Sequence, residues 1–187
     1  MIPIVSFYTI DTPYEQEAQE MKASAEAVGL RDIRLYPVLS KGSWERNCQL
    51  KAEIIQQAAH ELQTPFLYVD SDARFNEYPA MLDYAWDQDI AVHYFKGREL
   101  LSGTLWVNPS HETFALLAMW IVLNLEQPRV WDQKTLAQAI QQQPDLRVLR
   151  LPAEYCYIYD LSKQHYGERN AVITHYQASR KYKRGMK

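Results

Sequence analysis

The stretch FLYVDSD, residues 66–72, places two carboxylates directly after an apolar segment. The four residues before Asp70 are apolar or aromatic, which predicts a buried β-strand. Asp70 and Asp72 have one residue between them, so they share a side of an extended backbone or converge in a turn. Two converging carboxylates repel each other unless a cation neutralises them. The stretch therefore indicates either a divalent metal site at a strand end or two acidic residues that serve only the turn.

Two strand-and-helix units precede this strand. Apolar, β-branched and aromatic residues predict strands over Ile2–Thr9 and Ile33–Leu39. A helix is expected from Pro13 to Gly29, and a second helix carries an apolar stripe over Leu50–Leu62 before Pro65 ends it. Such alternation predicts a mostly parallel α/β sheet with helices on both faces. The two carboxylates then lie at its carboxyl edge, where open α/β sheets bind ligands.

The rest of the chain continues the alternation less regularly. Further elements are expected as a short helix at Pro79–Trp86, strands at Ile90–Tyr94 and Thr104–Val107, helices at Phe114–Leu125 and Thr135–Gln143, and late strands at Arg147–Leu149 and Val172–Thr174. The length of 187 residues suits one domain over residues 1–187, with a basic tail over residues 179–187.

Composition excludes several classes of protein. Hydrophobic residues make up 47% and charged residues 23%, as in globular domains, and the net charge of −3 gives no bulk attraction to nucleic acid or acidic membranes. Cys48 and Cys156 are the only cysteines, which excludes a disulfide scaffold and a paired CxxC zinc site. The apolar run Phe114–Leu123 is shorter than the about 20 residues of a membrane span. No membrane span and a cytoplasmic location are expected.

With the apolar strand before it, Asp70-Ser71-Asp72 resembles the DxD motif of the GT-A nucleotide-diphospho-sugar transferases, in particular glycogenin-like members. Other elements match in the order of that family and span nearly the whole chain. They are Arg46 and Lys51 on the preceding helix, Ser102-Gly103 at a strand start, Asp132-Gln133 at a helix start, Leu151-Pro152, and His175 with Arg180 and Lys181 after it. Two departures are Leu101 in place of the Asn of many members and Gln177-Ala178-Ser179 in place of a Gly-rich sequence.

The resemblance implies a single-domain, Rossmann-like GT-A fold and a metal-dependent hexosyl- or pentosyltransferase that retains the anomeric configuration. It implies that Asp70, Asp72 and His175 hold Mn²⁺ or Mg²⁺, and that Asp132 and Gln133 lie at the anomeric carbon as catalytic residues. The residues expected to bind the nucleotide-sugar donor are Tyr8, Arg46, Lys51, Asp70, Ser71, Ser102, Gly103, Arg180 and Lys181. A UDP-sugar is favoured because glycogenin-like members use one. The acceptor stays open among a glycan, a lipid, a protein and a modified DNA base.

Two other functions compete with this interpretation. A haloacid-dehalogenase-like phosphohydrolase also uses DxD, but usually at the first strand of the chain, whereas here the motif follows the third predicted strand. A non-catalytic domain that binds a nucleotide sugar or nucleic acid needs no turnover. Single residues have simpler alternatives too: Asp132 as a helix N-cap, Lys51 on a solvated helix face, His175 as a polar strand-end residue, and the basic tail as a solvated segment.

Overall fold

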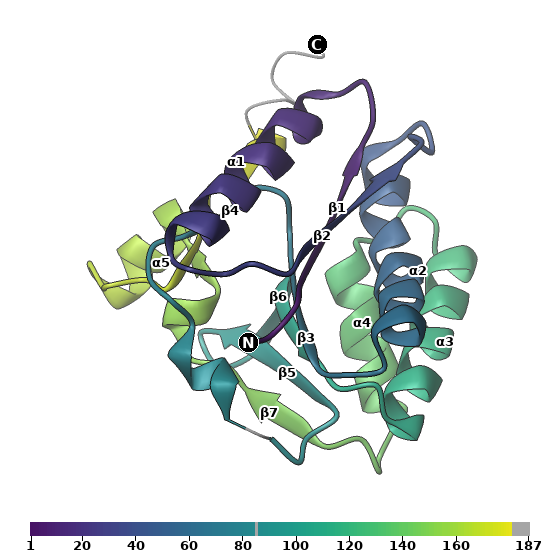
Figure 1. Cartoon of the computed structure of the whole chain (residues 1–187). Helices are drawn as coiled ribbons and strands as arrows, with labels where there is room; N and C mark the ends of the chain where they lie inside the picture. The colour runs from purple at the N-terminus through teal and green to yellow at the C-terminus, as the bar shows by residue number, and fades with distance from the viewer. Residues whose placement is uncertain (85, 181–187) are drawn as a thin grey trace.

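The computed structural model describes residues 1–84 and 86–180 (Figure 1). Its main sheet has the strand order β2-β1-β3-β6-β5-β7, and every strand except β6 runs in the same direction. The strands are β1 (Ile4–Thr9), β2 (Ile33–Val38), β3 (Phe66–Val69), β5 (Ile90–Phe95), β6 (Glu99–Val107) and β7 (Val148–Arg150). The predicted mostly parallel α/β sheet is confirmed.

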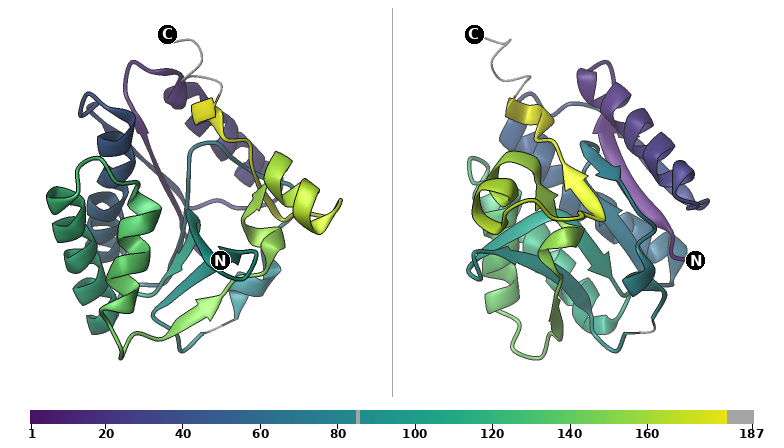
Figure 2. Two further views of the ribbon diagram at one scale, coloured as in Figure 1. Left: turned by 180° about the vertical axis from the view of Figure 1, so that it is seen from behind. Right: turned by 90° about the vertical axis from the view of Figure 1, so that its left-hand side faces the viewer.

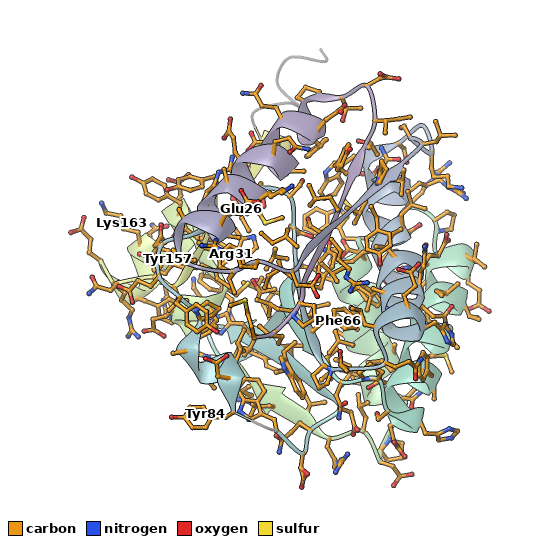
Figure 3. All side chains as sticks on the ribbon, viewed as in Figure 1. Glu26, Arg31, Phe66, Tyr84, Tyr157 and Lys163 are labelled. Carbon is orange, nitrogen blue, oxygen red and sulfur yellow. The ribbon has the colours of Figure 1, made fainter. Side chains whose placement is uncertain are left out.

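Helices cover both faces of the main sheet, with α2, α3 and α4 on one side and α1 on the other (Figure 1). The helices are α1 (Pro13–Ala27), α2 (Trp44–Leu62), α3 (His111–Glu126), α4 (Asp132–Gln141) and α5 (Tyr159–Tyr166). β3 lies between the two layers and is buried throughout. Phe66 and Tyr68 pack on the α2 side, and Leu67 and Val69 on the α1 side, because successive strand residues face opposite ways. Phe66 lies inside the molecule in Figure 3, whereas Tyr84 projects from its edge.

A second sheet with the order β4-β9-β8 joins the late part of the chain to the end of β3. Its strands are β4 (Ala73–Phe75), β8 (Tyr157–Ile158) and β9 (Ile173–His175). β4 pairs antiparallel with β9, and Ala73 lies opposite His175. Figure 2 shows β9, in yellow, returning to the side of the molecule that α1 occupies. Asp72, which directly precedes β4, is thereby placed next to His175.

Some elements differ from the sequence prediction. Ser102 and Gly103 lie within β6, because its antiparallel pairing with β5 extends the strand back to Glu99, whereas the predicted strand began at Thr104. The helix expected over Pro79–Trp86 is a short 3₁₀ turn, η1 (Ala80–Asp83). β4 and β8 are too short to give a periodic pattern, so they were not expected.

α3 contains the apolar run Phe114–Leu123 and packs against α2 and α4. Across residues 1–84 and 86–180, no helix has both the length and the apolar character needed to cross a membrane.

Candidate active site

Asp70, Asp72 and His175 converge at the carboxyl end of β3, as the resemblance implied. The turn after β3 closes through a 3.0 Å hydrogen bond from the Ala73 amide to the Asp70 carbonyl oxygen. One potential ligand atom from each of the three residues lies within 4.8 Å of the other two. Carboxylate oxygens and an imidazole nitrogen suit Mn²⁺ and related divalent ions. The donor set therefore fits a divalent cation.

His175 is held by contacts to both of its ring nitrogens. Nδ1 lies 3.3 Å from Asp72 Oδ1, and Nε2 lies 2.8 Å from Thr104 Oγ1. Burial lowers the pKa of His175, but its hydrogen bonds to Asp72 and Cys156 outweigh burial and raise that pKa to about 10. Burial raises the pKa of Asp72, but the His175 contact holds it below its usual range. The two groups form an ion pair, so metal binding at His175 requires the loss of its proton.

Gly103 leaves the space in which this site is assembled. A Cβ at this position would lie 3.1 Å from His175 Cε1, 3.3 Å from His175 Nδ1 and 3.4 Å from Asp70 Oδ2. The Gly103 carbonyl oxygen also accepts the Asp70 amide at 2.9 Å, which fixes the backbone of both residues. A side chain at this position would displace the potential ligands rather than the core.

Gly103→Ala is therefore expected to weaken Mn²⁺ binding by about tenfold, because displaced ligands lose their orientation. Isothermal calorimetry with Mn²⁺ measures the effect, and thermal unfolding should change little. Equal Mn²⁺ affinity in both proteins would show that the close approach of Gly103 has no role in ligand placement.

Lys51 lies inside a buried polar network and is not on a solvated helix face. Its Nζ lies 2.9 Å from Asp70 Oδ1 and 2.9 Å from Asp132 Oδ2, and donates to Ser102 Oγ at 3.1 Å. Lys51 is 3% exposed. Burial alone lowers the pKa of Lys51, but the carboxylates of Asp132 and Asp70 raise it above its usual range. Lys51 thus links the DxD motif to the start of α4 as a charged group.

Asp70 uses its two oxygens differently. Oδ1 accepts the Tyr68 hydroxyl at 2.8 Å as well as the Lys51 ammonium. The Asp70 side chain keeps 36% of its area exposed. Oδ1 is therefore held by the protein, and Oδ2 is the oxygen that remains for a ligand.

Asp132 does not cap α4, so that alternative is wrong. It is the first residue of the helix, and Trp131 occupies the N-cap position without a side-chain cap bond. The Asp132 carboxylate instead accepts the Ser102 hydroxyl at 2.7 Å. The next residue, Gln133, donates its Nε2 to Glu99 Oε1 at 3.2 Å. The Asp132 carboxylate is thus held by buried partners, whereas the Gln133 amide contacts the exposed Glu99.

A cavity of about 400 Å³ adjoins these groups. Most of the predicted site residues line it: Tyr8, Lys51, Asp70, Ser71, Asp72, Ser102, Gly103, Asp132, Gln133, His175 and Arg180. Arg46 does not. It lies on the far side of α2 from Lys51 and lines a separate hollow with Arg129, because each helical residue turns by about 100°. Lys181 lies outside the described residues.

Several residues of the site were not expected from the sequence. Tyr68 and Thr104 lie two positions from Asp70 and Ser102, so the alternation of a strand contained the signal for both. Glu99 and Cys156 also line the cavity. Glu99 gave no signal, because its position depends on the β5–β6 pairing.

Neither a family model nor a curated protein sequence matches this chain. Solved structures do match its fold. One is a glycosyltransferase involved in the glycosylation of the major capsid of PBCV-1, with a TM-score of 0.71, 18% identity, and coverage of 100% of this chain and 99% of that chain. The chain has a glycosyltransferase fold. Two further solved structures have the same fold. GlyE of Streptococcus pneumoniae TIGR4 matches with a TM-score of 0.65 and 14% identity over 94% of this chain and 55% of that chain. An active-site mutant of LgtC matches with a TM-score of 0.65 and 11% identity over 94% of this chain and 87% of that chain.

The GT-A fold expected from the sequence is thereby confirmed. A phosphohydrolase of the haloacid-dehalogenase type usually carries its DxD at the first strand of the chain, whereas here the motif follows the third strand, β3, and the fold matches glycosyltransferases. That alternative has no support in the structure. LgtC has also been solved in complex with donor and acceptor sugar analogs.

Proposed function

We propose that this chain is a metal-dependent glycosyltransferase that moves a sugar from a nucleotide-diphosphate sugar to an acceptor, with retention of configuration. The observation that carries the proposal is the convergence of Asp70, Asp72 and His175 beside the Lys51–Asp132 ion pair, in one cavity of a glycosyltransferase fold. The retaining outcome rests on the glycogenin-like order of motifs. UDP is the proposed nucleotide on the same ground.

The cavity offers charges of both signs to such a donor. Asp70, Asp72 and His175 would hold a Mn²⁺ or Mg²⁺ ion, which when bound supplies positive charge to the leaving diphosphate. Arg180 lines the same cavity from the chain segment after His175. Among the residues that the structure describes, its acidic partner is Asp160 at 4.0 Å, so its guanidinium is loosely held and can turn to a phosphate.

Asp132 and Gln133 are the proposed residues at the sugar. Lys51 and Ser102 fix the Asp132 carboxylate at 2.9 and 2.7 Å. A fixed negative group favours the positive charge that develops at an anomeric carbon as the glycosidic bond breaks. The network therefore positions the start of α4 before a donor arrives.

UDP binding should depend on divalent metal, because the diphosphate and the two carboxylates otherwise repel each other. We expect EDTA to weaken UDP binding by at least about tenfold relative to excess Mn²⁺. Calorimetric titration of the full chain with UDP under both conditions is the measurement. Equal affinities would contradict a metal that bridges protein and diphosphate.

The catalytic proposal is tested by a screen of nucleotide sugars, with hexose and pentose donors, in the presence of Mn²⁺. Slow release of free sugar and nucleotide is expected even without an acceptor. Tight binding without any turnover would favour the non-catalytic nucleotide-sugar-binding alternative.

The candidate acceptors are a glycan, a protein, a lipid and a modified DNA base. The PBCV-1 neighbour is involved in capsid glycosylation, and LgtC has been solved with an acceptor sugar analog. A protein and a glycan are therefore the first acceptors to test.

A further inference from the structure

The amide of Gln133 has a defined orientation, because its partner is a carboxylate. Gln133 Nε2 lies 3.2 Å from Glu99 Oε1. An ionised carboxylate only accepts hydrogen bonds, so the atom that faces Glu99 must be the NH₂ of the amide and not its oxygen. The carbonyl oxygen Oε1 is then the Gln133 atom left for a ligand in the cavity that both residues line.

The hydrogen bond joins two elements that meet at the cavity. Glu99 is the first residue of β6, and Gln133 is the second residue of α4. Asp132, its neighbour, is already fixed by Lys51 and Ser102. Glu99 therefore orients the half-buried side chain of Gln133, as Lys51 and Ser102 orient that of Asp132.

We propose that Glu99 is a positioning residue for sugar transfer: it holds the NH₂ of Gln133, so that the carbonyl oxygen of Gln133 faces the reacting sugar. This inference rests on the proposed function. A carbonyl oxygen carries partial negative charge and stabilises an oxocarbenium-like anomeric carbon, whereas an NH₂ group in the same place would oppose that charge. Glu99 acts through Gln133 and does not itself touch the reacting atoms.

The test uses Glu99→Gln in the full chain, because glutamine keeps the size of the side chain but can donate as well as accept. We expect UDP affinity with Mn²⁺ to be unchanged and the maximal rate of UDP-sugar hydrolysis to fall by about tenfold. Glu53→Gln is the matched control. It removes one exposed charge from the side of α2 that faces away from Lys51, and it should keep the full rate.

A double-mutant cycle shows whether Glu99 acts through Gln133. In a Gln133→Ala background, Glu99→Gln should have no further effect on the rate. An independent readout is the side-chain NH₂ signal of Gln133 in a ¹H–¹⁵N spectrum, identified by its loss in Gln133→Ala. That signal should shift in Glu99→Gln and stay in place in Glu53→Gln.

The outcomes separate this inference from the function on which it rests. A wild-type chain that turns over no nucleotide sugar overturns both. An active wild-type chain overturns this inference alone if Glu99→Gln hydrolyses the donor at the same rate, or if the two substitutions have additive effects. A raised KM with an unchanged maximal rate would also overturn it, because Glu99 would then act in binding.

Discussion

Asp72→Asn is expected to lower sugar transfer by at least about 100-fold, with little loss of stability. Asparagine keeps the size of the side chain, and its carbonyl oxygen can still accept the Ala178 amide, which Asp72 Oδ2 accepts at 2.9 Å. It removes the negative charge that pairs with His175 and that a divalent ion requires. Steady-state rates of UDP-sugar hydrolysis with Mn²⁺ measure the loss.

The matched control is Asp32→Asn, which removes an equal charge from an exposed carboxylate paired with Arg34 at 3.1 Å. This variant should keep the wild-type rate, because surface ion pairs contribute at most about 1 kcal/mol. Full activity in Asp72→Asn would contradict the assignment of Asp72 as a metal ligand. Loss of activity together with loss of the folded state would instead show that Asp72 stabilises the turn after β3.

Lys51→Met should destabilise the protein by about 3–5 kcal/mol, the largest stability effect that we expect from one substitution. Methionine fills similar space without a charge, so Asp70 and Asp132 face each other without the cation between them. A buried carboxylate that loses its partner keeps the cost of its desolvation. Urea unfolding of the wild type and the variant measures the difference in the free energy of unfolding.

Two further variants separate this cause from general damage to α2. Asp132→Asn added to Lys51→Met should recover a large part of the lost stability, because it removes one of the two opposed charges. Lys22→Met, in which the lysine is exposed and lies 3.9 Å from Glu26, should change stability by less than about 0.5 kcal/mol. If Lys51→Met proves as stable as Lys22→Met, the buried ion pair contributes nothing net.

The sequence predicted the first half of the fold well, because its elements are long and their apolar patterns are regular. β3 and the stripe of α2 give direct signals of burial, and the two carboxylates after β3 mark the functional edge. Tyr68 was predictable in the same way, as a residue on the same side of the strand as Asp70.

The later half was less predictable for a physical reason. β4, β8 and β9 have two or three residues each, and their pairing partners are far apart in the chain. The place of His175 came from the resemblance to a family and not from its local sequence. The resemblance placed Lys51 at the donor, but its local sequence also fitted an exposed helix lysine, since only tertiary packing shows that α2 turns this side chain toward Asp70 and Asp132.

The pairing of β4 with β9 has a consequence for the order of events during protein synthesis. Asp72 and His175 are separated by 103 residues, so the ribosome completes β1, α2 and β3 long before it adds His175. Contacts of such wide sequence separation form late, since a long loop must close before they give any stabilisation. A nascent chain can thus fold β1, β3 and α2 around an incomplete site. If Asp70, Asp72 and His175 hold a metal as proposed, its site is complete only when β9 has paired with β4, so Mn²⁺ binding would report that late pairing.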